Sequence, residues 1–372
     1  MASIVIRSTG LYVPEQVISN QELVTAFNAY VQHFNEQHAD AIAAGRCRAL
    51  GESSVEFIEK ASGIKRRHVL NKSGILDPQR MKPQLPLRGD DELSIQAEMA
   101  VAAAQQALDK ADRAASEVDG IIVACSNLQR PYPAVAIEVQ AALGCTGYAY
   151  DMNVACSSAT FAIQAAKQAL LAGDARSILV INPEICTAHM NFCERDSHFI
   201  FGDACTALLI ERVEQVPAGA WEILATKAIT QFSNNIRNNF GFLNRTEEAA
   251  ESEAEHLFRQ EGRKVFREVC PMVAETIAAQ LETLGLTPQD VQRFWLHQAN
   301  LNMNLLITRK LLGRDARADE APIVLDEFAN TSSAGSVIAL HLYEQDLPSG
   351  SLGVLCSFGA GYSIGSVVLK KG

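Results

Sequence analysis

Short apolar runs and longer alanine-rich segments alternate along the chain. The runs at 120–124 and 177–181 predict strands that are buried on both faces, because they lack alternating polar positions. The segments 92–109 and 157–171 contain few helix breakers, and the second one runs into Gly173, so both predict helices. This alternation predicts an α/β fold with a parallel or mixed sheet between layers of helices.

The second half of the chain repeats the order of the first half. Four segments recur in the same order and at similar spacing: residues 118–127, 143–144, 151–159 and 177–181 correspond to 291–300, 312–313, 326–334 and 351–355. We therefore predict two copies of one α/β unit, residues 1–215 and 216–372, with the junction between residues 215 and 230. A helix is also expected at 268–284 in the second copy.

Two segments have no counterpart in this repeat. Residues 26–52 are polar, and residues 71–91 contain Pro78, Pro83 and Pro86 among several charged side chains. Both are predicted to be insertions that lie on the surface or over a site. The polar and acidic segment 234–255 predicts a loop followed by a helix.

Composition and charge exclude several classes of protein. The 372 residues carry a formal net charge of −11, which disfavours nucleic acid or an anionic membrane surface as the main partner. The chain lacks an evident signal peptide, and the uncharged stretch 347–369 holds five Gly, five Ser and one Pro, which does not fit a membrane helix. The nine cysteines show neither a CxxC pair nor zinc-ligand spacing, so we expect free thiols, no metal site and a cytoplasmic protein.

One cysteine stands at a position suited to nucleophilic chemistry. Cys156 lies where a predicted strand meets the helix that begins near residue 157, among small side chains that leave room for a substrate. Unpaired N–H groups and the helix dipole at a helix N-terminus favour a thiolate, so we expect a lowered pKa. The alternative for any cysteine is a small buried apolar residue, which we expect for the other eight.

The repeat predicts that two further side chains approach this cysteine. His297 ends a predicted strand of the second half, and functional groups of α/β folds collect at the carboxyl ends of strands. Asn330 falls one residue before the equivalent of Cys156 in the repeat. If the halves pack about a pseudo-twofold axis, all three side chains converge. The alternatives left open are a buried structural role for His297 and a helix-capping role for Asn330.

The glycine-rich segment 358–365 offers a different kind of site. It does not match GxGxxG followed by a helix and an acidic residue, which excludes a dinucleotide-binding fingerprint. A tight turn that presents backbone N–H groups to an oxyanion fits this segment better.

These motifs resemble the thiolase superfamily and, within it, the β-ketoacyl-ACP synthase III group. The resemblance rests on Cys156, the HQAN run at 297–300, the NTS run at 330–332 and the FGxG turn at 358–361, and it covers nearly the whole chain outside the two insertions. It implies a five-layered αβαβα fold and a homodimer. It also implies Cys156 as acyl acceptor, with His297 and Asn330 binding a malonyl thioester.

The resemblance also implies roles for residues around this centre. The backbone N–H of Ala360 would join that of Cys156 in an oxyanion hole, and Tyr132 would be placed by the partner subunit at the bottom of the acyl channel. Phe358 and Asn300 would contact substrate.

The mouth of the site departs from the family pattern. Phe57 stands where the family often has a Trp that stacks on the adenine of coenzyme A, and Ala61 stands in place of an Arg. Asn302 replaces a basic residue linked to carrier-protein docking, although Arg309 and Lys310 remain on the same predicted helix.

The implied reaction is acyl transfer from acyl-CoA to Cys156, then decarboxylative condensation with malonyl-ACP in the initiation of fatty acid biosynthesis. Neither metal, flavin nor nicotinamide is expected, and the primer is expected to be a short or medium acyl-CoA. A thiolase would need a second catalytic cysteine, which Cys356 does not match, and a hydroxymethylglutaryl-CoA synthase would need an acid near the nucleophile. The alternatives left open are an enzyme that only transfers acyl groups, one that joins two long acyl chains, and a non-catalytic subunit of a condensing heterodimer.

Overall fold

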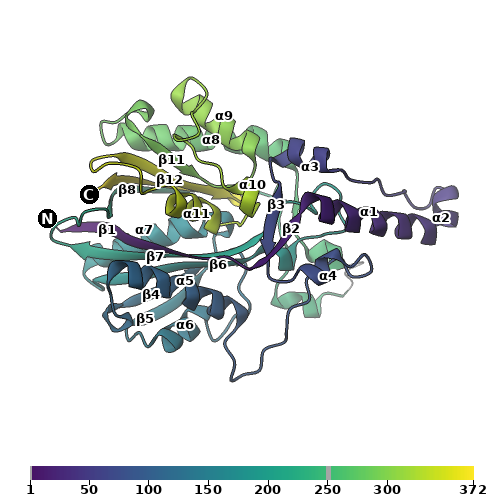
Figure 1. The fold of residues 1–372 in the computed structure, drawn as a ribbon, viewed down its shortest axis with the longest axis horizontal. Helices are drawn as coiled ribbons and strands as arrows, with labels where there is room; N and C mark the ends of the chain where they lie inside the picture. Colours follow the sequence, from purple (N-terminus) through teal and green to yellow (C-terminus); the bar gives the residue numbers. More distant parts are fainter. Residues whose placement is uncertain (1, 249–252) are drawn as a thin grey trace.

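The architecture is organised around one large mixed sheet (Figure 1). The computed structural model describes residues 2–248 and 253–372. Nine strands of these residues pair in the order β11-β12-β13-β8-β1-β7-β6-β4-β5. Their bounds are β1 (Ser3–Tyr12), β4 (Gly120–Ala124), β5 (Tyr148–Met152), β6 (Ser177–Ile185), β7 (Asp203–Val213), β8 (Trp221–Ser233), β11 (Arg293–Leu296), β12 (Leu352–Gly359) and β13 (Gly361–Lys371).

The sheet consists of two parts that meet along a short seam. Strand β1 pairs with β7 over most of its length but with β8 only at Val5↔Glu222 and Ile6↔Trp221. On one side of this seam β4 runs parallel to both β5 and β6, and on the other side β11 runs parallel to β12. The mixed sheet is therefore as the sequence predicts, and the seam falls between strands of the two predicted halves.

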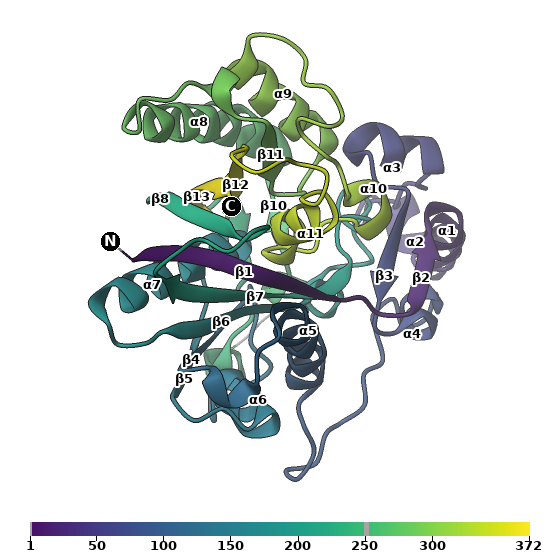
Figure 2. The ribbon, with the colours of Figure 1, turned by 60° about the vertical axis from the view of Figure 1, so that its left-hand side comes forward.

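Six helices complete the five layers. They are α5 (Ile95–Ala111) and α6 (Val135–Leu143) on one outer face, α8 (Gly262–Glu282) and α9 (Leu301–Leu312) on the other, and α7 (Ser158–Ala172) with α11 (Ala334–Leu342) in the middle. Figures 1 and 2 show α8 and α9 far from α5 and α6, with both parts of the sheet in between. The αβαβα layering expected from the sequence is thus present.

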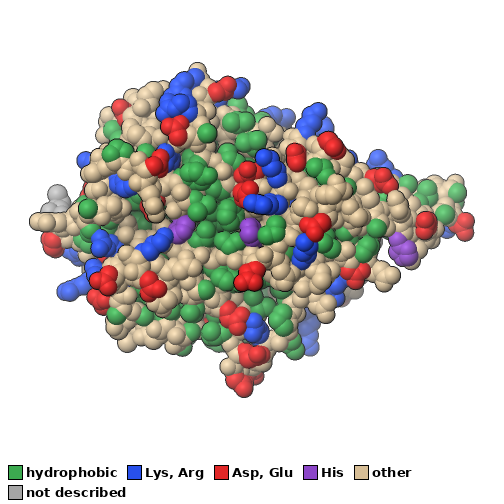
Figure 3. Space-filling view, in the orientation of Figure 1, with side chains coloured by type: hydrophobic (Ala, Val, Ile, Leu, Met, Phe, Trp, Pro, Cys, Tyr) green, Lys and Arg blue, Asp and Glu red, His purple; other side chains and the backbone are tan. Residues whose placement is uncertain are grey.

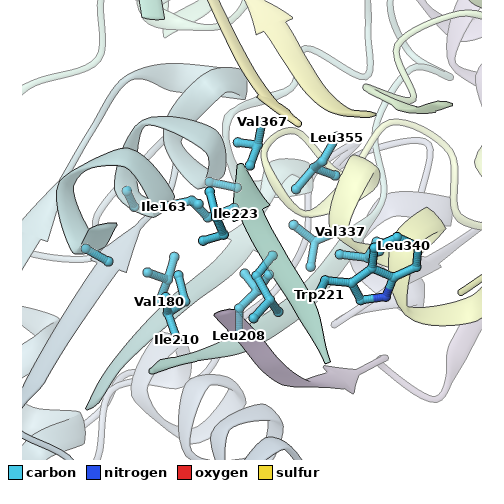
Figure 4. Packing of buried hydrophobic residues seen from close by; sticks show 14 of the residues in the cluster. Ile163, Val180, Leu208, Ile210, Trp221, Ile223, Val337, Leu340, Leu355 and Val367 are labelled. Atoms are coloured by element: carbon cyan, nitrogen blue, oxygen red, sulfur yellow. The ribbon is translucent and has the colours of Figure 1, made fainter. Parts of the chain in front are cut away.

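The middle layer forms a core that both halves share. Side chains of α7 and α11 pack there against strands from each side of the seam. Figure 4 labels ten residues of this core: Ile163, Val180, Leu208, Ile210, Trp221, Ile223, Val337, Leu340, Leu355 and Val367. The rings of Trp221 and Trp295 meet edge to face at 5.1 Å. Burying one isoleucine, leucine or valine side chain stabilises the fold by about 1.5–3 kcal/mol, so this layer, which contains many of them, is a major link between the halves.

The first predicted insertion forms a projecting arm. Helix α1 (Asn20–Gln37) begins at a capping box made by Ser19 and Glu22 and continues into the short α2 (Ala39–Ala43), which buries no side chain. Figures 1 and 3 show this arm extending beyond the body of the molecule. The arm is followed by α3 (Val55–Ser62).

The other irregular segments are short elements around the same end of the molecule. The second predicted insertion holds α4 (Lys72–Leu76) and then irregular chain up to the N-cap of α5. Two small hairpins pair β2 (Gln16–Ser19) with β3 (Arg66–Val69) and β9 (Ile236–Arg237) with β10 (Arg259–Gln260). The predicted loop at 234–255 contains two short 3-10 turns before α8 begins, and its residues 249–252 lie outside the described residues.

The two copies of the repeat differ at one landmark. The segment at 151–159 begins in strand β5, whereas its counterpart at 326–334 begins in helix α10 (Leu325–Phe328). The side-chain oxygen of Gln298 accepts hydrogen bonds from the N–H groups of Val324 and Leu325, which stabilises the single helical turn of α10 at its start. Among the described helices, none is both long and apolar enough to span a bilayer.

Candidate active site

Residues from distant parts of the chain line one cavity of about 650 Å³. Cys156, His297 and Asn330 all contribute to its wall, together with Phe358 and Gly359 of β12. The three side chains come from the start of α7, the end of β11 and the segment before α11. The convergence predicted from the repeat is therefore present.

Cys156 lies on a tight turn at the start of α7. A 3-10 turn (Ala155–Ser157) leads into the helix, and Ala155 has a left-handed φ of 47°. Gly359 faces the cysteine so closely that a Cβ built on it would lie 2.6 Å from the Cys156 Cβ and 3.0 Å from Sγ. Any larger side chain at position 359 would displace the thiol, so the glycine of the FGxG turn shapes the site.

The thiol of Cys156 is not activated in the way the sequence predicted. Burial raises its pKa to about 11, and the nearby Glu184 carboxylate adds to the rise. The Ser332 hydroxyl and the backbone of Ala360 and Cys156 oppose this rise by favouring the thiolate. The expected lowering of the pKa is wrong because desolvation outweighs the N–H groups at the helix N-terminus.

His297 is a buried, neutral hydrogen-bonding group. Its backbone N–H donates to the Cys356 carbonyl at 2.8 Å, which continues the pairing of β11 with β12. Its ring meets Phe358 edge to face at 5.2 Å. Burial lowers the pKa of His297 to about 4, so the imidazole is uncharged at neutral pH.

Asn330 is held in place by both its backbone and its side chain. Its N–H donates to the Ile200 carbonyl at 3.0 Å, and its carbonyl accepts from the Gly202 N–H at 3.1 Å. Its Oδ1 accepts the Ser332 N–H at 2.9 Å, which leaves Nδ2 without a hydrogen bond to the described residues. Asn330 does not cap α11, because the N-cap is Ser333, so the capping alternative is wrong.

The turn between β12 and β13 is as expected from the glycine-rich segment. Strand β12 ends at Gly359, Ala360 forms the turn and β13 begins at Gly361. The backbone groups of Ala360 and Cys156 both lower the pKa of the Cys156 thiol, which is the direction expected of N–H groups that would stabilise an anion there.

The residues expected at the mouth lie on the cavity wall. Phe57 lines it and carries the Arg195 guanidinium 3.9 Å from its ring centroid. Asn300 also lines it, but its polar atoms are used within the fold: Nδ2 donates to the Ala61 carbonyl at 2.6 Å and Oδ1 caps α9. Asn302 lines the same wall.

Three predicted residues lie outside the cavity of the single chain. Tyr132 is 82% exposed on the loop before α6. Arg309 and Lys310 are exposed in the last turn of α9, where Arg309 pairs with Asp315 at 2.6 Å. None of the three is among the lining residues.

Sequence reasoning missed two side chains at the site. Ser332 has a left-handed φ of 48°, and its hydroxyl favours the Cys156 thiolate. Glu184 is a carboxylate buried at the end of β6. The only signal for Glu184 in the sequence is a charged residue just after an apolar run. Among the described residues, we find no group of His, Cys, Asp and Glu that could hold a metal ion.

Comparison with known proteins decides the family. Profiles of 3-oxoacyl-[acyl-carrier-protein] synthase III match residues 150–231, and of its C-terminal part residues 281–371. A relative from Pseudomonas aeruginosa, named beta-ketodecanoyl-[acyl-carrier-protein] synthase, is 66% identical over 347 residues, covering 93% of this chain and 99% of the relative. The chain belongs to the synthase III family.

Other members of the synthase III family match over the full length. A beta-ketoacyl-[acyl-carrier-protein] synthase III from Dinoroseobacter shibae is 30% identical, with 98% of each chain covered. The crystal structure of the synthase III from Aquifex aeolicus superposes with a TM-score of 0.76 at 24% identity and full coverage of both chains, which shows the shared fold. This synthase III is thus an acyl-transferring condensing enzyme with the thiolase-like fold predicted from its motifs.

Proposed function

We propose that this enzyme elongates an eight-carbon acyl group to β-ketodecanoyl-ACP, with Cys156 as acyl acceptor and malonyl-ACP as extender. The convergence of Cys156, His297 and Asn330 on one cavity carries the proposal for the reaction. The name of the relative that is 66% identical supports the chain length. A β-ketodecanoyl product has ten acyl carbons, of which malonyl supplies two after losing CO₂, so the primer has eight.

The first half-reaction transfers the acyl group to sulfur. Because burial raises the pKa of Cys156 to about 11, the resting group is a thiol at neutral pH. Its sulfur attacks the acyl-CoA carbonyl, the carbon–sulfur bond to coenzyme A breaks, and the thiol proton ends on the departing coenzyme A thiolate. The N–H groups of Cys156 and Ala360 hold the oxyanion that forms on the way.

The second half-reaction forms the carbon–carbon bond. The thioester carbonyl of malonyl-ACP binds against His297 Nε2 and Asn330 Nδ2, and these two donors stabilise the enolate that remains when CO₂ leaves. The enolate carbon attacks the acyl-Cys156 carbonyl, the carbon–sulfur bond breaks, and the released thiolate takes up a proton from water to restore the thiol. Burial lowers the pKa of His297 to about 4, so both donors are uncharged at neutral pH. Neither one is an acid that would protonate the developing carbanion.

The pantetheine arms of both substrates would enter through the cavity, since it reaches from the protein surface near Phe57 to Cys156. Phe57 and Arg195 provide a flat surface for the adenine of coenzyme A, while the exposed Arg309 and Lys310 offer positive charge to an acidic carrier protein. Figure 3 shows acidic and basic side chains interspersed on one face of the molecule, so docking would depend on such local groups.

A homodimer in the cytoplasm completes the proposal. Strand β5 is an edge of the sheet, and Tyr150 on this strand is 38% exposed. Tyr132, on the loop before α6, is 82% exposed. An exposed edge and exposed aromatic side chains are typical of a surface that a second subunit covers. In such a dimer Tyr132 would reach the acyl channel of the partner.

The experiment is intact-mass measurement of the enzyme after incubation with acyl-CoAs of four to sixteen carbons. We expect a mass gain on Cys156 that is largest for the eight-carbon primer, followed by its loss and formation of β-ketodecanoyl-ACP when malonyl-ACP is added. A product formed from two acyl-CoAs without malonyl-ACP would instead identify an enzyme that joins two acyl chains. Absence of any acyl-enzyme would overturn the proposal.

A further inference from the structure

Glu184 is a buried carboxylate that the reaction steps above do not use. It lies on β6, is 1% exposed and forms no ion pair with Lys, Arg or His in the described part of the chain. An unpaired carboxylate at this depth is costly unless hydrogen bonds replace water. The structure supplies such bonds from two serines.

Both serines donate through backbone and side chain. Oε1 of Glu184 accepts the N–H groups of Ser126 and Ser333, each at 3.1 Å, and also the Ser333 hydroxyl. Oε2 accepts the Ser126 hydroxyl at 2.5 Å. Burial raises the pKa of Glu184, and the hydroxyl and N–H donors of both serines oppose this rise, because an ionised carboxylate can accept from all of them at once.

The two serines belong to the two halves of the active site. Ser126 follows β4, and its carbonyl accepts a hydrogen bond from Asn153 Nδ2 at 2.8 Å. Asn153 Oδ1 in turn accepts the Ala155 N–H at 2.9 Å, one residue before Cys156. This chain of hydrogen bonds connects Glu184 to the segment that carries the nucleophile.

Ser333 connects Glu184 to the other segment. It is the N-cap of α11 and directly follows Ser332, whose N–H fixes the Asn330 side chain. The carboxylate therefore joins two distant segments, because Ser126 lies 58 residues before Glu184 and Ser333 lies 149 residues after it. It is also near enough to the thiol to disfavour its ionisation.

We propose that Glu184 is the positioning residue that keeps Cys156 and the Asn330 amide in register, so that the enolate meets the acyl carbonyl during condensation. This inference rests on the proposed function of the site. It assigns Glu184 to the second half-reaction, because acyl transfer to Cys156 needs the oxyanion donors but not Asn330.

The main test compares Glu184→Gln with the native enzyme. Glutamine keeps the shape, and its one acceptor oxygen can still receive the N–H groups of both serines. Its Nε2 then faces the Ser126 hydroxyl, which can no longer donate there, and the negative charge that strengthens the remaining hydrogen bonds is lost. We expect the kcat of condensation to fall roughly 10- to 100-fold, as for a small misplacement of reacting groups, while KM for malonyl-ACP changes little. Acyl-enzyme formation, followed by mass, should stay within about threefold of native.

A readout of charge is independent of condensation. Removing the anion near the sulfur should shift the pH profile of Cys156 alkylation by iodoacetamide to lower pH in Glu184→Gln. Glu184→Asp retains the charge but is one methylene too short to reach both serines. It should therefore keep the native alkylation profile and still lose condensation.

Two further variants guard against a general loss of folding. Glu211→Gln removes another buried carboxylate, 5% exposed and paired with Arg113 at the far end of β7, and should leave both half-reactions unchanged. Ser333→Ala removes one hydroxyl donor and should lower condensation less than Glu184→Gln does, again with acylation intact.

The outcomes separate this inference from the proposed function. Equal losses of acylation and condensation in Glu184→Gln, or native condensation in both Glu184 variants, would overturn the positioning role. If the native enzyme itself formed no acyl-enzyme, the proposed function would fail. The alkylation profiles would then still report whether Glu184 acts on Cys156, and an unchanged profile in Glu184→Gln would overturn that action too.

Discussion

The polar side chains that line the cavity together with Cys156 include two hydrogen-bond donors without charge, His297 and Asn330. Burial keeps His297 neutral with a pKa near 4, and Asn330 keeps its Nδ2 free of hydrogen bonds to the described residues. Neutral donors suit an enolate, because they stabilise the developing oxyanion without supplying an acidic proton that would quench the carbon nucleophile. Because neither residue carries a positive charge, neither one lowers the pKa of the Cys156 thiol electrostatically.

Substitutions at the three residues should separate the half-reactions. Cys156→Ala should abolish acyl-enzyme formation but still release CO₂ from malonyl-ACP, because His297 and Asn330 remain. Asn330→Asp, which replaces the amide donor with a carboxylate oxygen, should keep acylation and slow condensation by about 10²–10³. Acyl-enzyme is measured by intact mass and decarboxylation by release of labelled CO₂.

The contrasting result concerns His297. If His297→Ala stopped acylation as completely as Cys156→Ala does, the imidazole would act as the base for the thiol. Our assignment of His297 to the enolate would then be wrong.

Among the elements, the turn between β12 and β13 sets the shape of the site. Gly359 is the last residue of β12, and a Cβ added to it would lie 2.6 Å from the Cβ of Cys156. Gly359→Ala should therefore displace the thiol and reduce the rate of acyl-enzyme formation about 100-fold with the fold retained. Gly241→Ala is the matched control, since a Cβ there meets no atom within 4 Å.

Thermal unfolding and acylation rate are measured on both glycine variants. Native acylation in Gly359→Ala would mean that the turn moves freely and does not shape the site.

Elements with strong local signals were predicted closely from the sequence. The run at 120–124 is strand β4, and the helix expected at 157–171 is α7 at 158–172. Helix α8 begins at Gly262, whereas the sequence predicted a start at residue 268. The start was missed because the N-cap residue makes no side-chain hydrogen bond, so the sequence contains no capping signal there.

Features that depend on packing were not predictable in this way. The converging Cys156, His297 and Asn330 followed from motifs and the repeat. The hydrogen bonds of Glu184 join residues 149 positions apart and leave no local pattern. The pKa of Cys156 depends on burial, which is a property of the folded chain, so a rule based on the helix N-terminus gave the wrong direction.

For the molecule as a whole, the proposed dimer would tie subunit assembly to substrate length through the exposed Tyr132. We expect light scattering at micromolar concentration to give twice the 40.3 kDa mass of the chain. Within the dimer, Tyr132→Ala should remove the end wall of the partner's channel and move the preferred primer from eight carbons to longer chains. Competition between acyl-CoAs of different length, read by intact mass, measures this shift.

Either of two results would contradict that prediction. A monomer at this concentration would remove Tyr132 from the channel, and so would an unchanged primer preference in a dimeric Tyr132→Ala.

Buried histidines should make the fold sensitive to mild acid. Burial lowers the pKa to about 4 at four positions: His189, His198, His297 and His341. Between pH 6.5 and 4 the unfolded chain binds protons at these histidines and the folded chain does not, so stability falls as pH falls through this window. The buried Asp203, with a pKa raised to about 6, acts in the opposite direction, as do Asp151, Glu184 and Glu344, whose pKa values burial also raises.

We therefore expect the urea midpoint of unfolding to decrease steadily from pH 7 to pH 5. A midpoint that stays constant or rises over this range would show that these imidazoles can be protonated within the fold.

The short seam between β1 and β8 has a consequence for how the enzyme can be altered. Strands β1 and β8 share only two residue pairs, so the angle between the two parts of the sheet depends strongly on side-chain volume in the layer of α7 and α11. Closely packed interiors transmit small changes in volume as shifts of whole elements. Substitutions at Ile163 or Val337 would thus change the distance between the Cys156 sulfur and the Asn330 side-chain amide without touching either residue. Directed evolution of this scaffold should therefore find beneficial changes in this core as well as in the cavity wall.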